Sequence, residues 1–314
     1  MYYDIVTVTM NPAIDKTTEV ESITVGGLNR LENVSFDVGG KGVNVSKMIM
    51  ALGGDSVATG FLGGGAGKEI ESALQGLQIK TDFVITRHPT RTNLKVINRE
   101  GVLTEFNEPG AVIMPDEESE LHDKLLYYAK PGVLFVLAGS IPRGVDTDVY
   151  KRVTCAVKKK GASVFLDADG DAFRHAVDAM PDFIKPNRFE LCQYFKKNTL
   201  LDKKECAELC RELVSKGITL VALSLGAEGA MFVTDDMALY APGLSVQALS
   251  TVGAGDSMVG ALAYGLGKGM SLKEAATLSV ACSAGAVMTQ GTNPPGRDRI
   301  NELLKLVKLE RVDI

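Results

Sequence analysis

The 314-residue sequence lacks tryptophan, is only 6% aromatic and has just three histidines. So few aromatic side chains offer single-stranded nucleic acid no stacking platform. A net charge of −5 without a basic stripe also disfavours nucleic acid as a partner. The histidines form no H-x-x-x-H pair of the kind that binds zinc. We therefore expect small-molecule partners and no nucleic acid.

The five cysteines are odd in number and irregularly spaced, which gives no disulfide framework. Cys206 and Cys210 lie one helical turn apart, but no second pair follows to complete a thiolate metal site. No apolar run reaches the roughly 20 residues of a membrane span. The opening MYYDIVTVTMNPAID shows no basic segment followed by an apolar one. We expect a reduced, cytoplasmic protein with no membrane partner.

Strand-like and helix-like segments alternate along the chain, most regularly after Pro131. VLFVLAGS (133–140) and ASVFLDAD (162–169) indicate buried strands, and the segment between them (146–161) indicates an amphipathic helix. Such alternation with nearly continuous apolar strands predicts a parallel sheet covered by helices on both faces. The length fits one large α/β domain with an accessory element, or two modest domains.

Two segments, residues 14–38 and 86–110, interrupt this alternation with polar, β-prone runs. They predict short antiparallel strands that could pair into a small sheet projecting from the core. A sheet over the strand ends could serve as a lid, and the alternative is an ordinary pair of surface hairpins. We assign residues 1–13, 39–85 and 111–314 to an α/β core.

The first glycine cluster, Gly39–Lys47, reads GGKGVNVSK. Small residues ahead of a helix let a ligand approach the backbone closely, while Lys41 offers a positive charge and Asn44 an amide. Neither this cluster nor GGGAGKE (63–69) has the spacing of a P-loop. Tight packing is the alternative explanation of such a loop.

The second cluster, Gly253–Ala254–Gly255, precedes Asp256 in STVGAGDSMVG. Consecutive backbone N–H groups at a helix start form an anion cradle suited to the charge on a transferring phosphoryl group. Asp256 has the reach to accept a proton from a substrate hydroxyl, as a general base must. Alternatively, this carboxylate merely complements the helix dipole.

Two later motifs each allow two interpretations. In KPNRFEL (185–191), Asn187 and Glu190 could orient waters on a Mg²⁺ ion or form a plain capping box. SLGAEGA (224–230) could be a hairpin turn or the wall of a nucleotide site.

Charged residues scattered through the first third of the chain could form a pocket for a phosphorylated sugar. Asp15 could bind sugar hydroxyls, and Arg30, Arg91 and Lys41 could bind a phosphate. Scattered arginines are more often solvated at the surface, so these residues need a motif to connect them.

Six motifs in order resemble those of the ribokinase or phosphofructokinase-B family of carbohydrate kinases: TMNPAID, GGKGVNVS, AGSIPRG, KPNRFEL, SLGAEGA and STVGAGDSMVG. They extend over essentially the whole chain, and their order is far more specific than any one of them. TRTNLKV and GVLTEFNEPG are most similar to the 1-phosphofructokinase branch, with tagatose-6-phosphate kinases as close relatives. The resemblance implies a ribokinase-like three-layer αβα core with a mostly parallel sheet. It also implies a projecting β-sheet lid and a homodimer formed through that lid.

The resemblance further implies transfer of the γ-phosphate of ATP, with Mg²⁺, to the C6 hydroxyl of fructose 1-phosphate. Asp256 would be the base, and the γ-phosphate would rest on the amides of Gly253, Ala254 and Gly255. The sugar phosphate would contact Asp15, Arg30, Gly39, Gly40, Lys41, Asn44, Arg91 and Ser140. The nucleotide would contact Lys185, Asn187, Ser224, Gly226, Gly229 and Thr251. Magnesium would be held through water by Asn187 and Glu190.

Other functions remain as alternatives. The acceptor could be tagatose 6-phosphate or fructose 6-phosphate, or the protein could be a non-catalytic sensor of sugar phosphates. Degraded GAGD and KPN-x-x-E motifs would support a non-catalytic sensor, but both motifs are intact in this sequence. A dinucleotide-dependent dehydrogenase needs G-x-G-x-x-G after the first strand, where this chain has TMNPAID.

Overall fold

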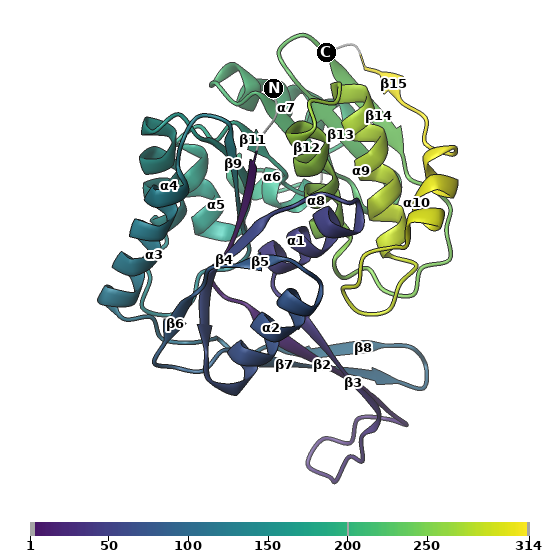
Figure 1. The fold of residues 1–314 in the computed structure, drawn as a ribbon. Coiled ribbons are helices and arrows are strands. Elements are labelled where there is room, and N and C mark those ends of the chain that lie inside the picture. Colours follow the sequence, from purple (N-terminus) through teal and green to yellow (C-terminus); the bar gives the residue numbers. More distant parts are fainter. Residues whose placement is uncertain (1–3, 200, 313–314) are drawn as a thin grey trace.

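The computed structural model describes residues 4–199 and 201–312. Its core is one eleven-stranded sheet (Figure 1). From edge to edge its strands are β15 (Glu310–Arg311), β14 (Ala238–Pro242), β13 (Gly229–Val233), β12 (Leu220–Ser224), β11 (Phe183–Ile184), β10 (Ser163–Asp167), β9 (Val133–Ala138), β1 (Asp4–Thr9), β4 (Val57–Gly63) and β5 (Lys80–Thr81). A further strand, β6 (Val84–Thr86), also pairs with β4.

Pairing is parallel from β5 to β12 and antiparallel from β12 to β15. The mostly parallel sheet is therefore confirmed. The central strands are apolar throughout because both faces are covered: all six residues of β9 are buried.

Ten helices cover the two faces of the sheet in the described part of the chain. They are α1 (Lys41–Ala51), α2 (Gly64–Gly76), α3 (Pro115–Tyr128), α4 (Val149–Lys159), α5 (Gly170–Val177), α6 (Arg188–Tyr194), α7 (Lys203–Ser215), α8 (Ala254–Gly267), α9 (Leu272–Ala286) and α10 (Arg297–Leu304). Successive side chains of β9 point to opposite faces of the sheet and so pack against different helix layers. Phe135 packs in the core cluster with helices α3–α7, and Leu134 packs with α1, α8 and α9.

A separate four-stranded sheet projects from the core and lies below it in Figure 1. Its order is β3 (Glu32–Gly39), β2 (Ala13–Val20), β7 (Arg91–Asn98) and β8 (Leu103–Phe106). The predicted small sheet is thus present. The expectation of purely antiparallel pairing was wrong, because β2 and β7 run parallel. They come from distant parts of the chain with core elements between them, so no hairpin fixes their relative direction.

Among the residues that the structure describes, no helix is both long enough and apolar enough to cross a membrane.

Candidate active site

Two cavities of about 390 Å³ each lie at the carboxyl ends of the parallel strands. The polar cavity faces the small sheet and its charged lining comprises Asp15, Lys41, Arg91, Lys95, Glu105, Asp169 and Asp256. The apolar cavity lies between the β12–β13 connection and helices α8 and α9, and its lining includes Leu244, Val246, Met258, Val280 and Val287.

The GAGD turn is the wall that the two cavities share. Gly253 and Asp256 line the polar cavity, whereas Ala254 and Gly255 line the apolar one. Gly253 caps α8 in the left-handed region with φ 81°, which glycine adopts without steric cost. The first amides of α8 have no partner inside the helix. The turn therefore directs backbone donors to the boundary between the cavities.

Asp256 sits at this boundary on the first turn of α8 and is only 8% exposed. Its Oδ2 accepts a hydrogen bond of 2.7 Å from Asn44 Nδ2 on α1. Burial, followed by the negative charge of Asp167, raises the pKa of Asp256 to about 6. The carboxylate is thus held in one orientation, and its proton affinity is that of a base working near neutral pH.

Asp167 at the end of β10 is a central residue that the sequence analysis did not single out. Its Oδ1 lies 3.3 Å from the Nζ atoms of both Lys41 and Lys185. Burial alone would raise the pKa of Asp167, but the two lysines hold it below its ordinary value. Asp167 in turn raises the pKa of Lys41. An acid that ends an apolar strand (VFLD) was the available signal.

Lys185 connects Asp167 to the GAGD turn. A Cβ atom placed on Gly255 would lie 3.3 Å from Lys185 Nζ. One buried ammonium therefore stands beside the helix start, where it adds positive charge to that of the unpaired amides. This arrangement brings together the predicted Lys185, Gly255 and Asp256.

Asn187 and Glu190 form the capping box that was one of the two interpretations of KPNRFEL. Asn187 Oδ1 accepts from the Glu190 amide and Glu190 Oε2 accepts from the Asn187 amide, both at 2.8 Å. Burial raises the pKa of Glu190. The box leaves Glu190 Oε1 out of the cap, so the role in magnesium binding stays a prediction.

Asp15 lies on β2 in the polar cavity and is already paired. Its Oδ2 accepts from Lys95 Nζ and its Oδ1 from Asn93 Nδ2, each at 2.9 Å. Both partners come from β7 and were missed by the sequence analysis, although both belong to the quoted TRTNLKV. Arg91, also on β7, donates to the carbonyl oxygens of Glu108 and Asn11.

Most of the other residues predicted for the sugar phosphate line the same polar cavity. Lys41, Asn44 and Ser140 line the polar cavity. Gly40, at φ 115°, also lines it, and a Cβ there would lie 2.7 Å from Thr9 Cγ2, so this position requires glycine for packing as well. Gly39 is not a lining residue, although a Cβ there would approach Asp15 Oδ2 at 3.1 Å.

The structure does not bring Arg30 to the polar cavity. Arg30 is exposed in the connection between β2 and β3, outside the cavity lining. The resemblance implied that Arg30 reaches the sugar phosphate from the small sheet, but β2 and β3 carry its connection away from the core (Figure 1).

Five of the six residues predicted for the nucleotide line the apolar cavity: Asn187, Ser224, Gly226, Gly229 and Thr251. The sixth, Lys185, is not in its lining and lies behind the GAGD turn, beside Asp167. SLGAEGA forms the end of β12, a short 3₁₀ turn and the start of β13. The hairpin turn is therefore confirmed, and the same connection is a wall of the apolar cavity. That this cavity takes a nucleotide stays a prediction.

Comparison with known proteins shows similarity to carbohydrate kinases over nearly the whole chain. A family profile described as pfkB family carbohydrate kinase matches residues 8–299. The chain is 31% identical to 1-phosphofructokinase of Vibrio cholerae over 97% of this chain and 96% of the relative. It is 30% identical to tagatose-6-phosphate kinase of Staphylococcus epidermidis over 98% and 100%. The structure of phosphofructokinase-2 from Escherichia coli in complex with potassium superposes with a TM-score of 0.92, at 31% identity, over 97% and 99% of the two chains.

These matches extend over nearly the whole chain and confirm the ribokinase-like fold expected from the sequence. The chain is a phosphotransferase enzyme and belongs to the pfkB family of carbohydrate kinases.

Proposed function

We propose that the protein transfers the γ-phosphate of ATP to the C6 hydroxyl of fructose 1-phosphate, giving fructose 1,6-bisphosphate. The observation that carries this proposal is the position of Asp256, a buried carboxylate at the boundary between a polar and an apolar cavity. Curated relatives named 1-phosphofructokinase, at 31–33% identity over nearly the full length, support this acceptor.

The apolar cavity has the character of a nucleotide site. Its aliphatic walls suit a purine ring, while Ser224 and Thr251 offer hydroxyls. At its inner end, the α8 amides and Lys185 suit the terminal phosphates. These residues fit ATP lying with its γ-phosphate toward Asp256.

The residues behind the turn also fit a hydrated Mg²⁺ ion. Asp167 Oδ2 is buried and has no hydrogen-bond partner among the described residues. Within residues 4–199 and 201–312 no cluster of three or more histidine, cysteine or acidic side chains could hold a metal directly. Mg²⁺ characteristically keeps several waters and binds one or two carboxylates. Asp167 and Glu190, with Asn187, would hold it, and it would neutralise charge on the transferring phosphoryl group.

The polar cavity provides the acceptor side. Lys41, Arg91 and Lys95 supply positive charge for the sugar's phosphate. Asp256 removes the proton from the C6 hydroxyl as its oxygen forms a bond to phosphorus, and the bond from phosphorus to the ADP oxygen breaks. Such a transfer needs mainly positioning and charge neutralisation, and the fixed carboxylate, lysines and amides supply both.

The acceptor is tested by measuring ADP release with each of three ketohexose phosphates. We expect kcat/KM for fructose 1-phosphate to exceed that for fructose 6-phosphate and for tagatose 6-phosphate by at least about tenfold, or 1.4 kcal/mol. The tagatose-6-phosphate kinase relative makes that sugar the main alternative. A preference for either 6-phosphate would contradict fructose 1-phosphate as the acceptor. No turnover with any of the three sugars would favour the non-catalytic sensor.

We also propose that two chains associate through the small sheet. Nine of the sixteen large apolar side chains that the structure exposes lie in this sheet and its connections. They are Ile23, Val25, Leu28, Leu31, Val34, Phe36, Val102, Leu103 and Phe106. Concentrations of this kind mark association surfaces, and a second copy would cover them by the same patch on both chains. The cytoplasmic location stays a prediction.

The double variant Val34→Glu/Phe36→Glu should shift the protein from dimer to monomer. The two residues are two positions apart on β3, so their side chains share one face of the strand and the variant places two charges on it. Light scattering after size exclusion measures the mass directly. Leu306→Glu, at another exposed apolar position (58% exposed), is the matched control and should remain dimeric. A monomeric wild type, or a double variant that stays dimeric, contradicts the interface.

A further inference from the structure

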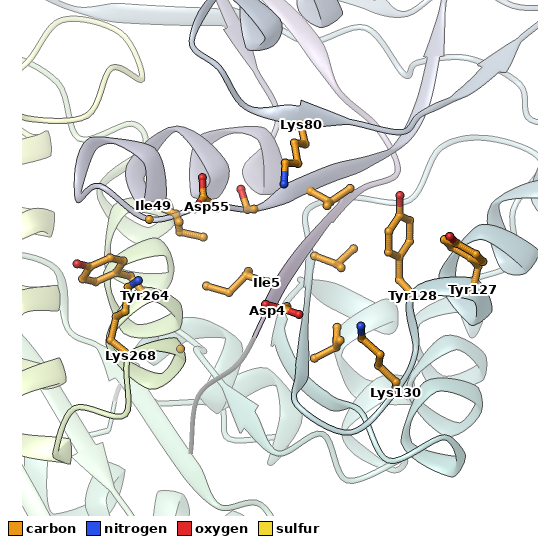
Figure 2. A pocket seen from close by; sticks show the side chains of 16 residues that line it. Asp4, Ile5, Ile49, Asp55, Lys80, Tyr127, Tyr128, Lys130, Tyr264 and Lys268 are labelled. Carbon is orange, nitrogen blue, oxygen red and sulfur yellow. The ribbon is translucent and has the colours of Figure 1, made fainter.

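A third cavity, of about 590 Å³, lies at the amino ends of the central strands, opposite to the two cavities described above (Figure 2). It opens where β1, β4 and β9 begin, and its floor includes Ile5, Val57 and Val133. None of its lining residues belongs to the polar or the apolar cavity. The proposed phosphoryl transfer therefore does not use this cavity, which we name the rear cavity.

The rear cavity carries charges that the protein does not pair. Lys80, Lys130 and Lys268 line it, are exposed, and have no carboxylate oxygen within 4 Å in the described part of the chain. The two acids in the lining, Asp4 and Asp55, likewise make no ion pair there. Lysines without partners around a concave surface are available to an anion from solution.

The three lysines are not equivalent. Lys268 is the C-cap of α8, so part of its charge complements the negative end of that helix. Lys80 lies on a strand, β5, and Lys130 lies beyond the C-cap of α3. In Figure 2 the amino groups of Lys80 and Lys130 point into the cavity from opposite sides. These two lysines form the stronger anion-binding pair.

Aromatic rings flank the same lysines. Tyr127 is 81% exposed, and its ring lies edge-on to that of Tyr128 with centroids 5.2 Å apart. Tyr128 donates a hydrogen bond to Asp82, which fixes its ring. Tyr264 lines the other end of the cavity. Lys268 Nζ lies over the Tyr264 ring, 5.8 Å from its centroid. A planar group attached to the anion would therefore meet the exposed ring of Tyr127.

Two helices connect the rear cavity to the catalytic end. Helix α1 starts at Lys41, carries Asn44, and ends at the rear cavity near Ile49 and Gly54. Helix α8 starts at the GAGD turn and ends there too, at Gly267. At 1.5 Å per residue they extend about 16 Å and about 21 Å.

The two helices are packed against each other along their length. A Cβ on Gly260 would lie 2.7 Å from Met48 Cβ, and one on Gly54 would lie 2.7 Å from the Tyr264 ring. At the catalytic end the same helices are joined by the bond between Asn44 and Asp256. A shift of one helix end cannot be absorbed locally in so close a contact.

We propose that the rear cavity binds a phosphorylated metabolite between Lys80 and Lys130, and that the bound ligand changes the affinity of the catalytic end through α1 and α8. The regulatory half rests on the proposed kinase activity. The binding half does not, and it is testable without turnover.

Binding is measured with pyrophosphate, which has no ring, and with ADP, which has one, by titration calorimetry. Because the two catalytic cavities are also proposed to bind phosphates, the rear cavity is assigned from the difference in affinity between the wild type and the variants. Lys80→Glu/Lys130→Glu should weaken one class of site by at least about tenfold, or 1.4 kcal/mol. Lys305→Glu/Lys308→Glu makes the same change of net charge at exposed positions outside every cavity described above and should leave that site unchanged.

A second readout uses the absence of tryptophan. Ultraviolet emission comes from eight tyrosines, of which Tyr127, Tyr128 and Tyr264 line the rear cavity. Pyrophosphate does not absorb in this range, so saturable emission changes that the Lys80/Lys130 variant loses report this site. Lys80→Gln/Lys130→Gln repeats the test without charge reversal should the first variant fold poorly.

A loss with both probes, or with ADP alone, supports the site, and their comparison shows whether a ring is needed. Unaltered binding of both probes in the Lys80/Lys130 variants overturns it. In turnover assays, pyrophosphate should alter the acceptor KM about threefold more in the wild type than in the variant, with basal turnover equal in the two. An equal effect in both overturns the coupling. Absent turnover in all forms contradicts the proposed function while leaving the binding result intact.

Discussion

Asp256→Asn should lower kcat by about 10²-fold or more while the fold and the binding of both substrates stay close to those of the wild type. Asparagine preserves the shape of the side chain but cannot accept the proton of the C6 hydroxyl. The amide would still meet Asn44, which lies 2.7 Å from Asp256 Oδ2. Steady-state kinetics with fructose 1-phosphate and ATP, together with a thermal melt, separate loss of the base from loss of structure.

The pH dependence distinguishes a base from a positioning group. Since the pKa of Asp256 is raised to about 6, wild-type kcat should fall as the pH decreases through about 6, where the carboxylate becomes protonated. The residual turnover of Asp256→Asn should lack this acid limb. Asp169→Asn changes another carboxylate of the polar cavity and is the matched control. Near-normal turnover of Asp256→Asn, or an unchanged acid limb, would remove Asp256 from the role.

Asp167→Asn should lower the free energy of unfolding by about 3–5 kcal/mol, because it leaves a buried ammonium without its counter-charge. The buried ammonium is that of Lys185, whose side chain is only 6% accessible and whose Nζ lies 3.3 Å from Asp167 Oδ1. Urea denaturation measures the change. Asp171→Asn breaks an exposed ion pair with Arg174 and should cost less than about 1 kcal/mol.

The difference in stability between wild type and Asp167→Asn should depend on pH in one direction. The lysines hold the pKa of Asp167 below its ordinary value, so its contribution is present above the unfolded pKa of about 3.9 and is lost as the pH falls through the lower folded value. The difference should therefore persist at pH 7 and shrink in acid. A constant difference down to strong acid would contradict the ionic contribution.

The same variant should affect catalysis at a distance from the reacting hydroxyl. Lys41 and Lys185 lose their common anchor, so kcat/KM should fall at least about tenfold through misplacement. Removing the negative charge of Asp167 also removes a cause of the raised pKa of Asp256. The acid limb of kcat should therefore move to lower pH, which a purely structural defect would not do.

Short-range sequence patterns were sufficient to predict much of the candidate site. The GAGD turn, the capping box of Asn187 and Glu190, and the β12–β13 turn each depend on residues within a few positions of one another. Glycine conformation, helix capping and strand alternation act at that range. The order of the six motifs then indicated the family, which the comparisons confirmed.

Contacts between residues that are far apart in the sequence could not be predicted from such local patterns. Asp167 joins Lys41 from 126 positions away, and Asp15 meets Lys95 across 80 positions. The parallel pairing of β2 with β7 and the exposure of Arg30 likewise depend on where the small sheet leaves the core. Each of these requires the register of strands that are distant in sequence, which no local propensity encodes.

The amino-acid sequence by itself determined the α/β alternation, the glycine turns and the residues that carry the kinase resemblance, because these depend on backbone conformation and periodicity within one element. Only the tertiary structure decided which charges neutralise one another, how high the proton affinity of Asp256 is, and that α1 and α8 join the catalytic end to the rear cavity. Those properties arise from burial and distance, and both are set only when the two helix layers close on the sheet.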